Sequence, residues 1–516
     1  MKNTWARVKS SIVTGILSAS LVACGGGDNP DNPASGSAGP TATYLFYQDS
    51  SAGGVISAVD PADPAHPIIP VETSAASEAT FAYHGTYDAA TQITSSFHPR
   101  TLIYAKDGKL WKINALKGST LSPVQLSNET TANLLCHTTT NEDFANHNNA
   151  VFFYSLPGPD GSCFTSDDIS KMVRVGMSAS DAPFNLGSIQ RITSINDSQT
   201  GAIEGWLATD GNNLNSYDAN FANPSMKATF TTGPSLFIFG GTTAVFLRID
   251  DKLRVYNPET GRLSPSRHTF SPGLTIRSSG RDGSNIFFID GNTIYKMPTE
   301  GNDPATQLVS ESDAEVCGDL HSIEDKLVYS CSNQTITTIK SVPKTGGASQ
   351  LLVAGSSEET LQIRHADRHW VYYNHLSGNS RRVAGAIKND NTGGKRIGNA
   401  MWVGAAFSSS GNVATRATLR IRLILAENYN LTSGFGGGTL KSYDALTNTP
   451  ITTIGTIPSD ISEVSLRRYV PGGTLLAVGY PEGRIEDADI FLINTETQNS
   501  LRRITNTPAI REYPLL

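Results

Sequence analysis

The residue types best suited to chemistry gather in a short acidic segment, PGPDGSCFTSDDIS, at residues 157–170. Asp160, Asp167 and Asp168 could supply the hard oxygen ligands that Ca²⁺ prefers, and Gly161 would permit a turn between them. The segment lacks the regular D-x-D-x-D-G spacing of a calcium loop, and it would serve equally as an acidic loop between two strands. We therefore expect no cofactor, with Ca²⁺ at these aspartates as the alternative.

A second group of possible ligands is His365, His369 and His375 in RHADRHWVYYNH. In one continuous strand these positions would share a face, so they could hold a metal ion. Residues 370–373, however, have the pattern of a strand core. Histidines that flank such a core usually pack or lie at its rim, and this is the interpretation that we favour.

Four cysteines follow residue 24, namely Cys136, Cys163, Cys317 and Cys331. An even number predicts disulfides in an exported protein. The sequence allows three pairings, and proximity favours Cys136 with Cys163 and Cys317 with Cys331. The second bond would close a loop of roughly 15 residues, worth about 3 kcal/mol in the chain-entropy model. The sequence contains no CxxC motif that would indicate a redox or metal-binding role for these cysteines.

The sequence lacks the catalytic motifs of the hydrolases that contain propellers. The chain has no G-x-S-x-G elbow leading into a helix, and DGKLW at residues 107–111 holds Asp, Gly and Trp in the wrong spacing for a sialidase turn. We expect a protein that is not an enzyme. The alternative is a lyase, lactonase or glycan hydrolase whose site residues come from several repeats.

The dominant pattern after residue 42 is a repeated hairpin. An alternating strand rich in Val, Ile, Phe and Tyr leads to a turn with Asp or Gly and then to a second alternating strand. It is clearest at residues 101–118, 244–261 and 285–301. Alternation on both arms indicates strands with two unlike faces.

Aligning the hairpins on the first apolar residue of the second strand gives a period near 40. The clear copies are at Leu110, Leu214, Leu253, Ile294 and Ile336. Weaker copies are at Ile56, Met172, Leu440 and Ile490, and a doubtful one is near Ile387. This period is typical of propeller blades, so we predict an all-β fold, a β-propeller. Because ten hairpins exceed a usual ring, we expect some to share a blade or to be miscounted, and the blades to number seven or eight.

The unit IFFIDGNTIYKMPTEG at residues 286–301 resembles the repeats of TolB-like and YWTD-like bacterial propellers. The resemblance covers most of residues 43–505 as a pattern and implies a rigid platform for binding or scaffolding. Its expected partners are an envelope protein, as the TolB-like repeats imply, or a surface glycan.

The N-terminus has the features of an export signal. Lys2, Arg7 and Lys9 precede a short apolar stretch at residues 12–23 that is too short to span a bilayer. The stretch ends in LVAC, residues 21–24, which resembles the lipobox of bacterial lipoproteins. The resemblance implies removal of residues 1–23 and acylation of Cys24. Gly25, where an aspartate would favour retention in the inner membrane, implies lipid-anchored delivery to the outer membrane.

We therefore expect three regions: a signal peptide at residues 1–23, a flexible tether at 24–41 and the propeller at 42–516. The tether contains little besides Gly, Pro, Asn, Asp and Ser. Loss of Lys2, Arg7 and Lys9 changes the net charge from −7 to −10, which argues against nucleic acid as a partner. No later segment is apolar and long enough to cross a membrane, so the lipid is the expected membrane contact.

Overall fold

The computed structural model describes the strands and most tight turns between residues 44 and 514. Residues 1–43, 515 and 516 lie outside the described residues, as do internal segments, the longest being 128–136, 143–148, 177–183, 197–202, 271–278, 409–419, 429–437, 482–488 and 506–511. The expected signal peptide and tether fall on the first of these and stay predictions. All regular elements in the described part of the chain are β-strands.

The described strands form ten antiparallel sheets in sequence order, each with four strands on its main path. The first contains β1 (Leu45–Asp49), β2 (Val55–Val59), β3 (Ile68–Glu72) and the C-terminal β41 (Glu512–Pro514). The second contains β4 (Ser77–Asp88), β5 (Ile93–Lys106), β6 (Lys109–Asn114) and β7 (Val124–Gln125). The third contains β8 (His137–Glu142), β9 (Asn149–Leu156), β10 (Ile169–Gly176) and β11 (Phe184–Gly187). The fourth contains β12 (Ile189–Asn196), β13 (Ile203–Asp210), β14 (Asn213–Asp218) and β15 (Ser225–Thr229). The fifth contains β16 (Leu236–Phe239), β17 (Val245–Ile249), β18 (Lys252–Asn257), β19 (Arg262–Leu263) and, off the main path, β20 (His268–Thr269).

The second half of the chain repeats this arrangement. The sixth sheet contains β21 (Ser279–Asp282), β22 (Asn285–Asp290), β23 (Thr293–Pro298) and β24 (Thr306–Ser310). The seventh contains β25 (Val316–Ile323), β26 (Lys326–Ser332), β27 (Thr337–Pro343) and β28 (Gln350–Ala354). The eighth contains β29 (Glu359–Ala366), β30 (Trp370–Ser377), β31 (Arg381–Lys388) and β32 (Gly394–Arg396). The ninth contains β33 (Ala400–Ser408), β34 (Arg420–Glu427), β35 (Thr439–Asp444) and β36 (Thr449–Thr456). The tenth contains β37 (Ile461–Val470), β38 (Thr474–Pro481), β39 (Asp489–Asn494) and β40 (Arg502–Arg503).

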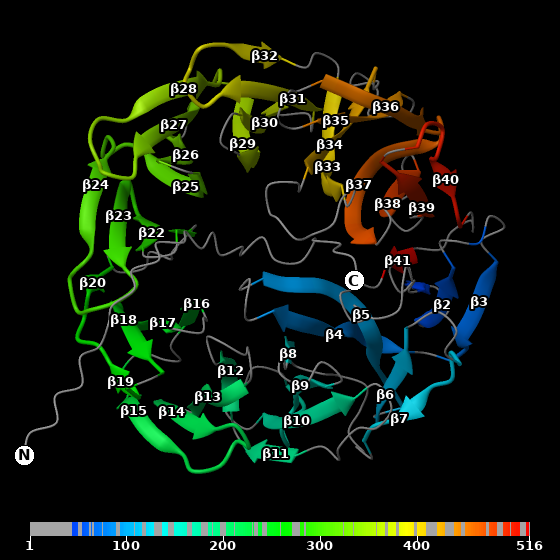
Figure 1. Cartoon of the computed structure of the whole chain (residues 1–516), viewed down its shortest axis with the longest axis vertical. Coiled ribbons are helices and arrows are strands. Elements are labelled where there is room, and N and C mark those ends of the chain that lie inside the picture. Colours follow the sequence, from blue (N-terminus) through cyan, green and yellow to red (C-terminus); the bar gives the residue numbers. More distant parts are fainter. Residues whose placement is uncertain are drawn as a thin grey trace, which may run out of the picture.

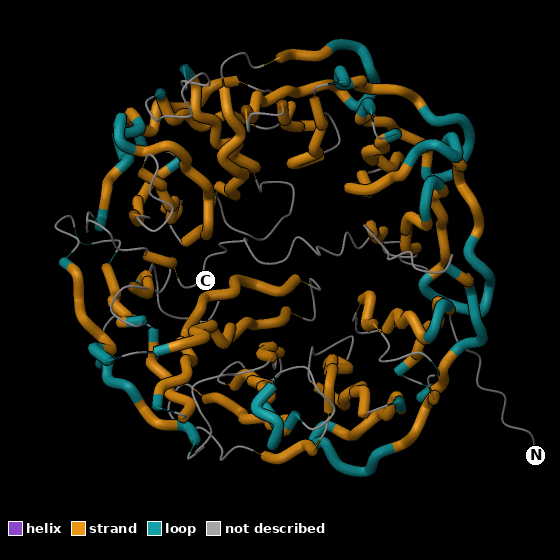
Figure 2. The backbone as a smooth tube through the Cα atoms, turned by 180° about the vertical axis from the view of Figure 1, so that it is seen from behind, coloured by secondary structure: helices purple, strands orange, loops and turns teal. Residues whose placement is uncertain are grey.

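The sheets stand around a ring (Figures 1 and 2). In every described sheet but the first, the first strand lies towards the middle and the last strand of the main path lies at the circumference, whereas in the first sheet β41 is innermost and β3 outermost. The first sheet combines both ends of the chain, because β41 pairs antiparallel with β1. A ring of four-stranded antiparallel sheets joined in this way is a β-propeller.

The middle strands bury both of their faces, one against each neighbouring sheet. On β22, Phe287 and Ile289 pack with the seventh sheet, whereas Ile286 and Phe288 pack with the fifth. On these strands, alternate residues therefore form two apolar faces. On a half-buried strand they would form one apolar and one solvent-exposed face. This explains why the strands contain continuous apolar runs such as IFFI.

The described residues contain nine apolar clusters, and each joins two consecutive sheets of the ring. One of them joins the last sheet to the first, because Leu45, Tyr47 and Val59 pack against Ile490 and Leu492. The ninth and tenth sheets meet through β33 and β37. Neighbour-to-neighbour packing therefore continues around the whole ring.

The expected count of seven or eight blades is not confirmed, because the described residues form ten sheets. Each of the ten hairpins in the sequence belongs to a sheet of its own. The expected number was too low because we assigned more than one hairpin to some blades, so that the ring would have seven or eight. The stacking rule itself sets no such limit, since each sheet needs only its two neighbours.

The register of the strands agrees with the hairpin alignment in four sheets. Four of the aligned residues directly precede the same register shift between the outermost strand and its neighbour: Ile56, Leu214, Ile294 and Leu440. In the third and seventh sheets this shift follows Ser170 and Ile339, so the alignments on Met172 and Ile336 were wrong by two and three residues. Ile336 lies in the turn before β27, which is longer than the two-residue turns elsewhere.

The disulfide between Cys317 and Cys331 is present and joins directly opposite residues of β25 and β26. Both residues are buried between the sixth and seventh sheets. Cys136 and Cys163 lie outside the described residues, so their bond stays a prediction. Among the described residues there is no helix that is long and apolar enough to cross a membrane.

We expect Phe287→Ala to destabilise the fold by about 3–5 kcal/mol, because it removes a fully buried ring from the packing between two sheets. Urea unfolding followed by tryptophan fluorescence measures the change. The matched control is Met226→Ala on an outer strand, where the side chain is 65% exposed and the change should stay within about 0.5 kcal/mol. Equal midpoints for the two variants would contradict the packing scheme.

Candidate functional site

The first strands β25 and β29 of two neighbouring sheets lie towards the middle of the ring (Figure 1) and are described along their whole length. These strands contact one another. Because first strands line the middle of a propeller, their side chains are the ones that a ligand in the channel would meet.

Both strands carry a bulge at their polar residues. The register of β25 against β26 shifts between Gly318 and His321, and that of β29 against β30 shifts between Ile363 and His365. Asp319 in the first bulge has a φ of 48°, a left-handed conformation that aspartate tolerates better than most residues. Bulges re-aim side chains and are frequent next to functional sites.

The two bulges bring a pair of histidines together across the sheet boundary. Burial and, to a smaller extent, the nearby His365 together lower the pKa of His321 to about 4. His365 is itself buried, and its ring lies 6.2 Å from that of Tyr372. His321 is therefore a neutral imidazole at physiological pH, able to donate one hydrogen bond and accept another.

Asp319 completes the group. Burial raises the pKa of its carboxyl, although Ser330 and Arg364 oppose the shift. The Ser330 hydroxyl donates to Asp319 Oδ2 over 3.4 Å, and Arg364 Nη1 donates to Gln362 Oε1 over 3.1 Å. A carboxyl and an imidazole that both resist charging, close to a guanidinium, form the kind of cluster found at binding and catalytic sites.

The three histidines singled out in the sequence are not on one strand. His365 lies on β29 opposite Tyr372, and His375 lies on β30 opposite Leu361. His375 Nδ1 is 3.5 Å from Glu359 Oε2. The expectation of a shared face required one continuous strand, whereas β29 and β30 are two antiparallel strands. His369 lies outside the described residues. Among the described residues no group of three or more His, Cys, Asp or Glu side chains could hold a metal ion.

The acidic segment lies between β9 and β10, as expected for a loop. Asp160 is exposed and accepts a hydrogen bond from the Ser162 backbone over 2.7 Å. Asp168 directly precedes β10, and Asp167 lies outside the described residues. The calcium alternative therefore stays a prediction, as does acylation of Cys24, which also lies outside the described residues.

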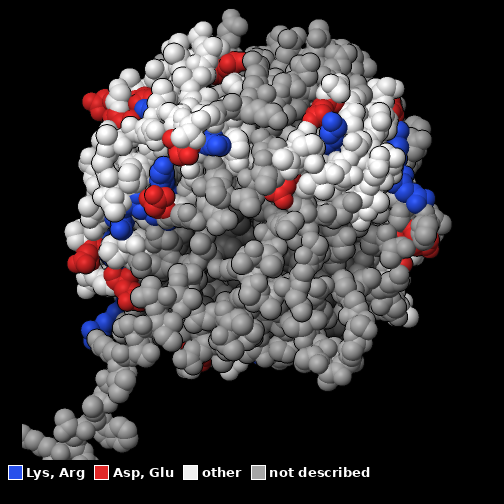
Figure 3. Space-filling view, turned by 45° about the horizontal axis from the view of Figure 1, so that its top comes forward, with Lys and Arg blue, Asp and Glu red and all other residues white. Residues whose placement is uncertain are grey.

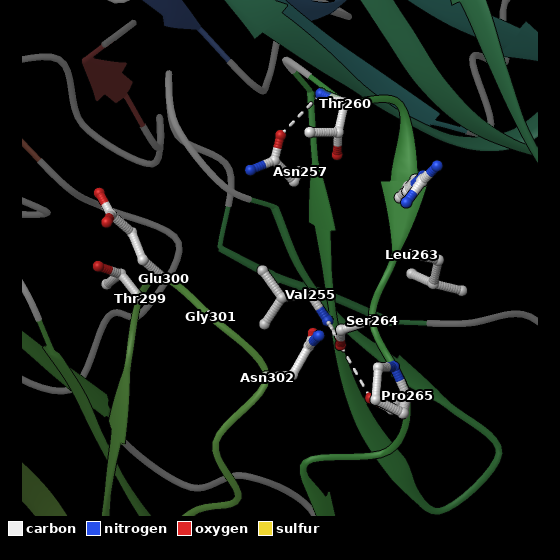
Figure 4. Close-up of a pocket in the computed structure, with 11 residues that line it drawn as sticks. Val255, Asn257, Thr260, Leu263, Ser264, Pro265, Thr299, Glu300, Gly301 and Asn302 are labelled. Atoms are coloured by element: carbon white, nitrogen blue, oxygen red, sulfur yellow. Dashed lines mark hydrogen bonds between the residues drawn. The ribbon is translucent and has the colours of Figure 1, made fainter. Parts of the chain in front are cut away.

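A separate pocket of about 240 Å³ lies near the circumference between the fifth and sixth sheets (Figure 4). One wall comes from β18, β19 and the residues between and after them, and the other from residues 299–302 after β23. Its lining is mostly polar, with Asn257, Thr260, Arg262, Ser264 and Asn302 among the residues. No sequence pattern indicates this pocket, because its walls come from two different repeats.

No family model and no curated protein matches this chain. Among solved structures, the chain is similar to one described as a eukaryotic initiation factor, with 11% identity, a TM-score of 0.47 and coverage of 92% of this chain and 97% of that chain. Hsv2 of Kluyveromyces lactis gives 11% identity and a TM-score of 0.31, over 62% of this chain and 98% of that one. A chain of a nidogen/laminin complex gives 10% identity and 0.25, over 50% and 93%. Such distant likenesses say nothing about activity, and the propeller class rests on the sheet order.

We expect the stability of the protein to fall between pH 6.5 and pH 4 in a way that depends on His321. The pKa of His321 in the folded protein is about 4, below the value of about 6.5 for a free imidazole. Between these pH values His321 binds a proton in the unfolded chain but stays neutral in the folded chain. This contribution is complete above pH 6.5 and is lost as the pH falls towards 4. Thermal unfolding at pH 7 and 4.5 should show a smaller loss for His321→Gln than for the unaltered protein. An imidazole NMR signal of His321 that titrates near 6.5 would contradict this account.

Proposed function

We propose that the protein is a lipid-anchored protein of the bacterial cell envelope and that its propeller is a platform for binding another envelope protein. The ring of ten sheets carries this proposal. Because every sheet is packed on both sides, the ring presents its loops and edges on a rigid support. The lipobox-like residues 21–24 support the anchor, and residues 25–41 would let the ring stand away from the membrane.

A protein partner agrees with the surface of the circumference. Large apolar side chains are exposed on the outermost strands of five sheets: Ile68, Val124, Met226, Leu351 and Ile451. All five are aliphatic or methionine, which suits apolar protein contacts, whereas sugars pack best on flat aromatic rings. Acidic and basic side chains are interspersed on the described part of the face in Figure 3, so this face offers no single-sign patch to a highly charged partner.

The second candidate is an enzyme with its site in the channel. The observation that favours it is the group formed by Asp319, His321 and Arg364 on two inner strands. A neutral imidazole beside a carboxyl could transfer protons to or from a glycan or lactone. The platform is the better supported function, because the described group is small and exposed apolar residues recur on the outermost strands of five sheets.

We expect Cys24→Ser to stop lipid attachment, because serine lacks the thiol that would be acylated. Radiolabelled palmitate should enter the unaltered protein but not the variant, and the variant should accumulate as an unprocessed precursor in membrane fractions. Cys317→Ser is the matched control and should keep its label. Normal processing of the Cys24 variant would refute the anchor and leave the platform untouched.

A photoreactive amino acid at position 226 or 351 should cross-link a protein in intact cells, because both positions are exposed on outer strands. The control position is Arg364, which is exposed on an inner strand. Mass spectrometry of the purified adducts would identify the partner. Adducts that resist protease but yield to glycan-degrading enzymes would instead show a glycan, and glycan capture at position 364 alone would favour the enzyme.

A further inference from the structure

Hydrogen bonds hold together the two walls of the pocket between the fifth and sixth sheets. Nε of the buried Arg267 donates to the Asp303 carbonyl over 2.7 Å, and the Ala305 backbone N–H donates to the Arg267 carbonyl over 2.8 Å. Arg267 lies between β19 and β20 of the fifth sheet, whereas Asp303 and Ala305 lead to β24 of the sixth. These bonds fix the spacing of the walls directly after Asn302, which lines the pocket. The pocket is therefore formed before a ligand arrives, and this preorganisation reduces the cost of binding.

The wall from the fifth sheet is largely apolar. Val255, Leu263 and Pro265 line it. Ser264 lies among them, but its hydroxyl is already engaged, because it accepts from the Val255 backbone N–H over 2.9 Å and donates to the Pro265 carbonyl over 2.8 Å. Figure 4 shows Val255 between Glu300 on one side and Leu263 on the other. A ligand in the pocket would therefore meet an apolar surface.

Polar side chains surround this apolar surface. Arg262, Glu300 and Asn302 line the pocket and are exposed, and their side chains form no hydrogen bond or ion pair within the described part of the chain. Thr260 and Thr299 add two hydroxyl groups to the lining. Together these side chains offer a ligand both hydrogen-bond donors and acceptors.

The charges and the size of the pocket restrict the class of ligand. Arg262 and Glu300 contribute one charge of each sign, so an anion or a cation would be attracted by one of them and repelled by the other. This favours a neutral ligand. The volume of about 240 Å³ lies below the range of roughly 300–1,000 Å³ for the sites of drug-sized molecules, so the ligand must be small.

We propose that this pocket binds a single neutral sugar unit, with the C–H groups of the sugar ring against the apolar wall and its hydroxyl groups against the polar side chains. The Glu300 carboxylate can accept from two neighbouring hydroxyls, and the Asn302 carboxamide can both donate and accept. None of the described lining residues is aromatic, so hydrogen bonds rather than ring stacking orient the sugar, and we expect millimolar affinity. The site is separate from the protein platform, because none of the exposed large apolar residues in the described part of the chain belongs to the fifth or sixth sheet.

The test uses the whole protein with the methyl glycosides of glucose, galactose and N-acetylglucosamine as neutral probes. Glucuronate and glucosamine are the charged counterparts, and saturation-transfer NMR measures binding. At least one neutral sugar should bind in a saturable way and more tightly than either charged sugar. A trisaccharide of that sugar separates the two sources of the ligand: it should bind at least as tightly if the natural ligand is the end of a glycan, and more weakly if it is a free sugar. Failure of every neutral sugar to bind, or preference for a charged one, would overturn the proposal.

Variants of exposed residues assign the binding to this pocket without threatening the fold. Asn302→Ala should weaken sugar binding about fivefold, since it removes a hydrogen-bonding side chain. Glu300→Gln should raise the affinity for glucuronate relative to the neutral sugars, because the repelling charge is gone. Gln307→Ala is the matched control: it removes an exposed carboxamide from β24 of the sixth sheet, outside the pocket, and should leave binding unchanged. Undiminished binding by Asn302→Ala would overturn the site, and this result would not bear on the protein partner proposed above.

Discussion

The packing of each sheet against both of its neighbours is the interaction on which the rest of the structure depends. A four-stranded sheet of this kind cannot hide two apolar faces alone, and each pair of sheets still leaves two faces exposed. Stacking stops only when the last sheet meets the first, as Tyr47 and Ile490 do across the closing boundary. The pairing of β41 with β1 adds backbone hydrogen bonds at the same place. Closure therefore removes exposed apolar faces that an open row of sheets would keep.

The same constraint shapes the interior of the ring. First strands converge on the axis, where there is least space, and several of them are bulged where the middle strands are regular. A bulge leaves a residue out of the ladder and turns its side chain. In the described wall this places Asp319, His321 and His365 at one sheet boundary. The polar group thus lies on two bulged first strands that face the middle of the ring.

The sequence was informative wherever a property repeats along the chain. Alternation and turn residues located all ten hairpins, including the doubtful one near Ile387 in β31. The sequence was uninformative where the surroundings of a residue come from another sheet. The histidine pair could not be predicted, because a one-residue bulge changes which face His365 occupies. Arg267 gave no signal either, since arginine is usually exposed and its burial comes from a loop of the next repeat.

Buried charged side chains in this ring differ in how fully other groups of the chain compensate them. Glu72 is almost fully buried but accepts from Lys106, Tyr104 and Ser74, and the pKa of Glu72 falls to about 2 despite the opposing effect of burial. Lys340 bridges Glu311 and Glu315 in a similar way. Such groups are compensated by the chain itself, so they stabilise and need nothing further. Arg267 is more deeply buried than Lys340, yet both of its terminal nitrogens lack such compensation. The Asp303 carboxylate interacts electrostatically with this guanidinium and opposes the lowering of its pKa by burial, so the chain supplies a counter-charge here without a hydrogen bond to the terminal nitrogens.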